Sequence, residues 1–221
     1  MEEKVRVIAI DGPGGVGKSS VAKGLARKME GWFYLDTGAM YRAITWSWIQ
    51  DGSVDERLSD SEWLDELVLE IDGSHIMMNS VDISKEIRSR EVTGLVSQVA
   101  ASPTVRAALT VMQQEIGRAN PCIVDGRDIG TVVFPDAFLK VFLIASPEIR
   151  ARRRWLQLGG DASPMTEEEL VADLMRRDTH DSTRECAPLK AAVDAWKLDT
   201  DVYSQEEVTE LIYDEAQKRL N

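Results

Sequence analysis

The chain has 221 residues, of which 43% are hydrophobic and 29% charged, and its formal net charge is −12. This length suits one α/β domain with an inserted lobe, and the composition is that of an ordinary globular protein. The acidic balance argues against a nucleic-acid polymer as partner, because binding a phosphate backbone needs a basic face.

No apolar run approaches the length of a membrane span, and the start of the chain is too charged and short for a signal peptide. We therefore expect a cytoplasmic protein with no membrane partner. Cys122 and Cys186 have no C-x-x-C partner, so we expect both to be buried thiols in a reducing compartment.

The N-terminal pattern predicts a strand, a glycine-rich loop and a helix. Val5–Ile10 is a short β-rich run, the stretch DGPGGVGKSS follows it, and apolar residues then recur at helical spacing. Trp32–Leu35 predicts a second strand that ends at Asp36, and the residues after Gly38 predict another helix.

Short β-like runs between residues 63 and 84 are separated by the turn signals Asp-Gly and Asn-Ser, which predicts a small antiparallel insertion. Two helices are expected after it, at roughly Glu86–Ala100 and Thr104–Ala119. Ser102 is the expected N-cap of the second helix, with Pro103 in its first turn.

The second half of the chain alternates strands and helices. The stretches PCIVDG, FLKVFLIA and AWKLDT predict strands. Ser146-Pro147 opens an arginine-rich helix, Thr166–Glu169 is a capping box for the next one, and Ser204-x-x-Glu207 caps a C-terminal helix. This alternation predicts a parallel sheet covered on both faces.

The loop after the first strand matches the phosphate-binding pattern G-x-x-x-x-G-K-[ST] in the strand–loop–helix context that this pattern demands. Glycines let backbone N–H groups turn toward a phosphate, and the helix N-terminus adds a favourable dipole. Lys18 is expected to reach the β- and γ-phosphates of ATP, and Ser19 to ligate Mg²⁺. The expected nucleotide-binding residues are Gly12, Pro13, Gly14, Gly15, Val16, Gly17, Lys18, Ser19 and Ser20.

No asparagine is followed by lysine, so the N-K-x-D guanine-reading motif of GTPases is absent. The length and a local arginine surplus favour a small-molecule kinase, since two facing phosphate groups must have their charges neutralised. Arg42, Arg106 and Arg127 come from segments near strand ends, while the cluster at 150–184 could form a closing lid. For Arg150 and Arg176 a solvated surface charge is the competing interpretation.

Five stretches together resemble bacterial cytidylate kinases, the nucleoside-monophosphate kinases that phosphorylate CMP and dCMP. They are IDGPGGVGKSS, LDTGAMYRA, SQVAASPTVRAAL, VDGRDIGTVVFPDA and RRDTHDSTRECAPL, in the family's order and across nearly the whole chain. The antiparallel insertion also resembles the enlarged monophosphate-binding lobe of that family.

The resemblance implies a role for each matching position. Cytosine would be read by Ser97, Arg106 and Asp128, and the CMP phosphate would be held by Arg42, Arg127 and Arg184. Arg177 and Asp181 would contact the ribose, and Thr37 and Tyr41 would line the same pocket. Arg153 would contact ATP. The expected catalytic residues are Lys18, Arg127, Asp128, Arg177 and Arg184.

The chemistry of these residue types suits cytosine. A carboxylate accepts a hydrogen bond from the N4 amino group, whereas uracil would direct its O4 acceptor at the same carboxylate.

Two departures from the family pattern are Thr37, in place of the more usual serine, and His180, where arginine is common. Asp36 is either a helix cap or a nucleotide-site carboxylate, and Asp125 could order Mg²⁺ through water.

The sequence thus predicts a three-layer α/β P-loop kinase with a five-stranded parallel core sheet, an inserted lobe containing a small antiparallel sheet, and a short helical lid. The expected reaction is ATP-dependent phosphorylation of CMP and dCMP by a monomer. Alternatives are another acceptor (UMP, shikimate or dephospho-coenzyme A) or a non-catalytic nucleotide-binding module. The expected divisions are a core of 1–36, 101–150 and 185–221, a lobe of about 37–100 and a lid of about 151–184.

Overall fold

The computed structural model describes residues 6–72 and 75–220. The chain divides into two compact units, one made of Met1–Tyr34 with Gly117–Asn221 and the other of Leu35–Ile116. Among the described residues, no helix is long and apolar enough to cross a membrane. The expected division into core, lobe and lid stays a prediction.

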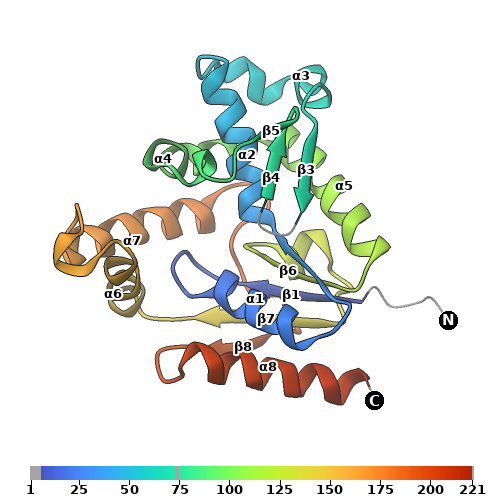
Figure 1. The fold of residues 1–221 in the computed structure, drawn as a ribbon, viewed down its shortest axis with the longest axis vertical. Coiled ribbons are helices and arrows are strands. Elements are labelled where there is room, and N and C mark those ends of the chain that lie inside the picture. The colour runs from blue at the N-terminus through green and yellow to red at the C-terminus, as the bar shows by residue number, and fades with distance from the viewer. Residues whose placement is uncertain (1–5, 73–74, 221) are drawn as a thin grey trace. The chain divides into compact units, whose positions relative to one another are not determined.

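A five-stranded sheet has the order β2-β6-β1-β7-β8 (Figure 1). Its strands are β1 (Val7–Asp11), β2 (Phe33–Asp36), β6 (Cys122–Gly126), β7 (Leu139–Ile144) and β8 (Trp196–Asp199). β1 pairs in parallel with β6 and β7, and β7 pairs in parallel with β8. Every residue of β1 and β6 is buried, as expected for strands covered on both faces. The predicted parallel core sheet is confirmed.

The described part of the first unit contains four long helices. They are α1 (Lys18–Lys28), α6 (Pro147–Gln157), α7 (Glu167–Thr183) and α8 (Gln205–Leu220), with a π-helix η3 (Ile129–Val133) and a short 3-10 helix η4 (Gly160–Ala162). α1 and α8 lie side by side (Figure 1), and their buried residues Leu25 and Ile212 join one apolar core with Ile8 and Val141 of the sheet. A smaller core links α6 to α7 through Ala151, Leu170 and Leu174.

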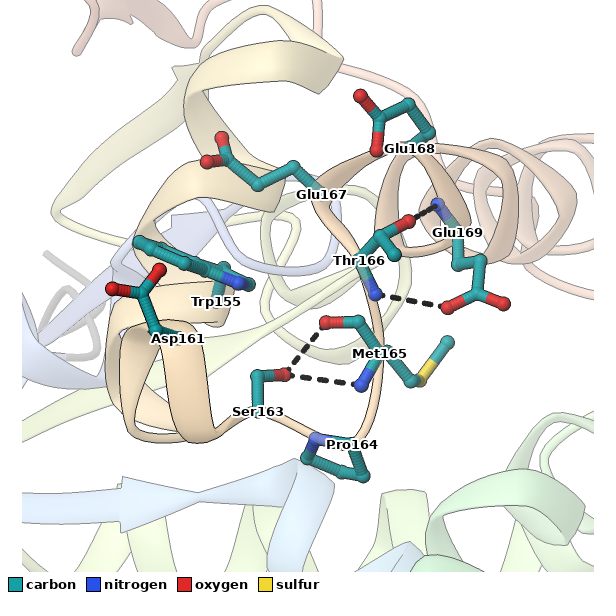
Figure 2. Close-up of a pocket in the computed structure, with 9 residues that line it drawn as sticks. All are labelled: Trp155, Asp161, Ser163, Pro164, Met165, Thr166, Glu167, Glu168 and Glu169. Carbon is teal, nitrogen blue, oxygen red and sulfur yellow. Dashed lines mark hydrogen bonds between the residues drawn. The ribbon is translucent and has the colours of Figure 1, made fainter.

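Helix starts follow the capping chemistry expected from the sequence. The Ser146 hydroxyl accepts from the Ile149 N–H at 3.4 Å. Thr166 and Glu169 form the reciprocal capping box seen in Figure 2, with bonds of 3.2 and 2.9 Å. Ser204 and Glu207 do the same at the start of α8. These three predicted helix starts are confirmed.

The second unit contains the predicted antiparallel sheet. Its elements are α2 (Thr37–Gln50), η1 (Asp55–Ser59), α3 (Ser61–Asp65), β3 (Leu69–Asp72), β4 (His75–Met78), β5 (Val81–Asp82), η2 (Glu86–Arg88), α4 (Arg90–Val99) and most of α5 (Pro103–Ala119). β4 pairs antiparallel with both β3 and β5. Asn79 and Ser80 have φ of 48° and 65°, as a tight hairpin turn requires. The expected Asp-Gly turn extends into Gly73, which lies outside the described residues.

The helix expected over Glu86–Ala100 is divided in the structure. Ser89 has extended backbone, with φ −58° and ψ 158°, and its hydroxyl accepts from the Val92 N–H. A serine side chain that caps the following turn competes with continuing the helix, so η2 ends and α4 begins at this residue. The next predicted start is confirmed, because Ser102 accepts from the Val105 N–H at 3.2 Å.

Gly117 in α5 provides a test of the packing. A Cβ added there would lie 2.5 Å from the ring of Phe134, which is fully buried. We expect Gly117→Ala to lower the free energy of unfolding by about 1–3 kcal/mol, although alanine favours helix. Urea unfolding would measure the change.

Gly94 in α4 is the matched control, since a Cβ there would meet nothing within 4 Å. Gly94→Ala should stabilise the protein by up to about 1 kcal/mol. Equal effects of the two substitutions would contradict the packing described around Phe134.

Candidate active site

The glycine-rich loop joins β1 to α1. Gly12, Gly15 and Gly17 have φ of 149°, 76° and 99°, which side chains with a Cβ rarely adopt. A Cβ on Gly12 would also overlap the backbone carbonyl of Leu143 in β7. The sequence pattern therefore reflects a real backbone requirement, and the loop leads directly into the N-terminus of α1.

Lys18 is the first residue of α1 and is almost fully buried. Its Nζ donates to the carbonyl oxygen of Pro13 at 2.7 Å. Burial, followed by repulsion from Arg127, lowers the pKa of the Lys18 amine to about 7. A nucleotide phosphate at this loop would bring the negative charge that favours the ammonium form.

Ser19 and Asp125 make an oxygen pair beside the loop. The Ser19 hydroxyl donates to Oδ2 of Asp125 at 2.7 Å, and the Tyr34 hydroxyl donates to Oδ1 at 3.0 Å. Hydroxyl and carboxylate oxygens are the ligands that Mg²⁺ prefers, and this ion usually keeps waters and substrate phosphates as its other ligands. In the described part of the chain, no group of three or more His, Cys, Asp or Glu could hold a metal. The pair offers two oxygens of the kind that Mg²⁺ prefers.

Asp11 at the end of β1 is a buried residue to which the sequence analysis gave no role. Its carboxylate accepts from the backbone N–H groups of Ile129 and Gly130, at 2.8 and 2.7 Å. Burial raises the pKa of Asp11 to about 6, although the two hydrogen bonds oppose this. Asp11 thereby anchors η3, which directly follows Asp128. A carboxylate closing an apolar strand before the loop was the signal that could have identified it.

Four predicted site residues of the first unit lie together. Arg127 donates from Nε to Oδ2 of Asp181 at 3.0 Å, and Asp181 is buried. Arg184 donates to the Ala187 carbonyl oxygen at 2.8 Å, and its Nη2 lies 3.6 Å from Oδ1 of Asp128. The four residues thus form two arginine–aspartate pairs, which are joined through the neighbouring residues Arg127 and Asp128.

α7 contributes the remaining predicted residue of this unit. Arg177 is half-buried and lies one turn before Asp181, so both are on one side of the helix. Arg176 is exposed and pairs with Asp173, which agrees with a surface charge. His180 is also exposed, in the last turn of α7.

The second unit holds the other predicted residues. Asp36 accepts from the Ala39 N–H at 2.8 Å and receives a hydrogen bond from Arg42 at 3.1 Å. Of the two roles considered for Asp36, the structure shows that of a helix cap. The same carboxylate also orients the Arg42 side chain. Thr37 is buried at the start of α2.

Arg106 and Tyr41 form a buried contact in the same unit. The Arg106 guanidinium lies 5.3 Å from the centre of the Tyr41 ring and donates to the Ala100 carbonyl oxygen at 3.1 Å. Ser97 is half-buried on α4. A planar arginine fixed against an aromatic ring is suited to hydrogen-bond a flat base.

Two arginines of α6 contact backbone around the phosphate loop. Arg153 donates to the hydroxyl of Thr200 at 2.9 Å and to its carbonyl oxygen at 2.5 Å, and it approaches the Val16 carbonyl oxygen at 3.5 Å. Arg150 is 3% exposed, so the surface interpretation of this residue is wrong. It donates to the Gly14 carbonyl oxygen and pairs with Asp178.

A separate hollow of about 390 Å³ opens between the end of α6 and the start of α7 (Figure 2). Four carboxylates are among its lining residues, namely Asp161, Glu167, Glu168 and Glu169. It contains none of the predicted site residues, and its negative lining would repel phosphate. The glycine-rich loop therefore remains the candidate nucleotide site.

The pKa of Asp11 leads to a test by pH. Because its folded value of about 6 lies above the ordinary 3.8, the folded state binds a proton that the unfolded chain has lost. The stability contributed by Asp11 is therefore present below the unfolded pKa and is lost as the pH rises through about 6. Relative to Asp11→Asn, the wild-type protein should lose about 1 kcal/mol between pH ~5 and pH ~7.5 in urea unfolding. A difference that grows in the opposite direction would contradict the assignment.

Two solved structures are similar to this chain in fold. A gluconokinase from Sinorhizobium meliloti 1021 has a TM-score of 0.50 and 14% identity, covering 98% of this chain and 94% of that one. An uncharacterized protein from Eubacterium ventriosum has a TM-score of 0.52 and 11% identity, covering 98% and 99%. At these identities the likeness concerns the fold alone.

Comparison of sequences is more specific. A cytidylate kinase from Shouchella clausii is 47% identical, with 94% of each chain covered. A bifunctional pantoate ligase/cytidylate kinase from Prochlorococcus marinus is 48% identical over 94% of this chain, which spans only 44% of that relative's length. The family described as cytidylate kinase matches residues 8–218. With nearly its whole length matched, the chain belongs to the cytidylate kinase family.

Proposed function

We propose that the chain transfers the γ-phosphoryl group of ATP to CMP or dCMP, giving ADP and CDP or dCDP. The observation that carries this proposal is the buried Lys18 beside the Ser19–Asp125 oxygen pair, at a glycine loop opening α1. Such a loop binds phosphate through backbone N–H groups, and its lysine reaches the β- and γ-phosphates.

On the donor side, Lys18 would stabilise the charge that develops on the transferred phosphoryl group. Ser19, with Asp125 behind it, would hold Mg²⁺, which neutralises the β- and γ-phosphate oxygens when it is bound. Arg153 would contact ATP from α6. The phosphate oxygen of the acceptor is already anionic, so in-line transfer needs no side-chain base.

On the acceptor side, we propose the roles that the family resemblance implies. Arg42, Arg127 and Arg184 would hold the phosphate, and Arg177 and Asp181 would contact the ribose. Support comes from the geometry within each unit, since every one of these arginines whose contacts are described is fixed by a carboxylate or a carbonyl oxygen. A fixed guanidinium loses little entropy when it binds a phosphate.

Cytosine would be read by Asp128, Arg106 and Ser97, with Thr37 and Tyr41 lining the pocket. Asp128 is buried, so uracil, with its O4 acceptor facing the carboxylate, would leave polar groups unpaired there. The cation–π contact between Arg106 and Tyr41 supports a fixed donor for N3 or O2 of the base. Selectivity for cytosine over uracil would follow.

An acceptor panel tests this function. Release of ADP from Mg·ATP should be fast with CMP and dCMP, at least about tenfold slower with UMP, and near zero with AMP, shikimate or no acceptor. Lys18→Ala is the control that should remove turnover with every acceptor, because it lacks the phosphate-binding amine. Equal rates with and without acceptor would refute a kinase, and a preference for another acceptor would refute the cytosine assignment.

Arg42→Ala tests the acceptor phosphate site. Losing a charged hydrogen-bond donor costs about 1.5–3 kcal/mol, so the Kd for CMP should rise about 10- to 100-fold. The Kd for ATP should change less than about threefold, as measured by calorimetry. Arg57→Ala, at an exposed arginine of the same unit that pairs with Asp51 and Asp60, is the control and should alter neither. A larger loss for ATP than for CMP would move Arg42 to the donor side.

A further inference from the structure

Arg150 joins three segments of the first unit. Its Nε donates to the Ala145 carbonyl oxygen at 3.2 Å, and its Nη1 donates to the Gly14 carbonyl oxygen at 3.0 Å. The same Nη1 lies 2.6 Å from Oδ2 of Asp178 on α7. One guanidinium on α6 thus contacts the residue that follows β7, the phosphate loop and α7.

Stability alone does not explain this arrangement. The Arg150 side chain is 4% exposed and that of Asp178 is 21% exposed, so both charges have lost most of their water. Oδ1 of Asp178 is buried and has no hydrogen-bond partner among the described residues. A desolvated and incompletely satisfied ion pair is often no more stable than apolar residues of similar volume. The role of Arg150 is therefore better judged from its directional hydrogen bonds to backbone carbonyl oxygens.

The contact with Gly14 fixes a peptide group that would otherwise rotate easily. Gly14 and Gly15 are adjacent, and glycine pairs place little steric limit on a peptide flip. In a trans peptide the C=O and the following N–H point in opposite directions. With its Gly14 carbonyl oxygen bound to Arg150, this peptide directs the Gly15 N–H away from α6.

Neighbouring contacts hold the loop from the same helices. A Cβ on Gly15 would meet the Cβ of Arg150 at 3.4 Å, and one on Gly14 would meet Leu174 of α7 at 3.6 Å. The loop backbone therefore lies directly against α6 and α7. An anion-binding loop needs its N–H groups oriented in advance, because each one that must reorient weakens binding.

We propose that Arg150 is a positioning residue, clamped by Asp178, that orients the phosphate loop for the polyphosphate of the donor nucleotide. It touches the loop's carbonyl side and does not need to contact the nucleotide. The inference rests on the proposed function, since that function places a triphosphate at this loop.

The test measures binding to the full chain in the absence of any acceptor. Tripolyphosphate and ATP are titrated calorimetrically into wild type, Arg150→Gln and Arg152→Gln. We expect Arg150→Gln to weaken both ligands about tenfold, with the Kd for CMP changed less than about twofold, since the loop's N–H groups lose their fixed orientation. Arg152, an exposed residue on the same helix that pairs with Glu167, is the matched control and should behave as wild type.

A double variant separates positioning from folding. Arg150→Gln strands the Asp178 carboxylate, whereas Arg150→Gln with Asp178→Asn removes both charges. The double variant should recover the melting temperature but keep the tenfold loss of tripolyphosphate affinity. Wild-type affinity in the double variant would overturn the proposal, whether or not the single variant folds.

Asp178→Asn alone keeps the arginine and its carbonyl contacts while removing the clamp. It should weaken tripolyphosphate by about threefold, and unchanged affinity would overturn the role given to Asp178. Suppose that the Arg150 substitutions weaken tripolyphosphate binding as expected, but the wild-type protein phosphorylates none of the acceptors. That result would refute the proposed function and leave this inference standing.

Discussion

The arrangement of the first unit depends on charged side chains that are buried at the carboxyl end of the five-stranded sheet. Lys18, Asp11 and Asp125 are each buried there, at the ends of β1 and β6 or at the start of α1. An isolated buried charge would be very unfavourable, so each is supported by backbone groups or by an opposite charge. Burial nevertheless dominates, because it lowers the pKa of Lys18 and raises that of Asp11, while the supporting groups oppose both shifts in part. Such a site is suited to the proposed ligand, a nucleotide polyphosphate that binds together with Mg²⁺.

The buried charged side chains hydrogen-bond to backbone groups of other segments and hold those segments in place. Asp11 binds two N–H groups of η3, which begins just after Asp128, while Arg150 and Arg153 bind carbonyl oxygens of the loop before α1. The loop and the residue proposed to read cytosine are therefore each fixed by a buried charge from another segment. In the second unit, Asp36 does the same for Arg42. Asp11, Arg150 and Asp36, which are given no ligand contact, thus position segments or side chains that are proposed to bind phosphate or base.

The sequence predicted most of the fold because its signals are local. Helix caps at Ser146, Thr166 and Ser204 depend on side chains three residues away, and all three begin helices as expected. The glycine loop was equally local, since its φ angles restrict the residue type. The one helix that differed was divided at Ser89, where a cap within the pattern outweighed the apolar spacing. The predicted roles of the site residues rest on the family resemblance and stay proposals.

What the sequence determined by itself was the phosphate loop, the parallel sheet and the family, because each is encoded by neighbouring residues or by motifs in order. The tertiary structure decided which charges are buried and what they contact. Arg150 could be read as a surface residue, yet it is enclosed between the loop and α7, and Asp11 carried no recognised role. Burial and pairing arise between segments distant in the chain, such as Gly14, Arg150 and Asp178, and no local pattern records which of them will meet.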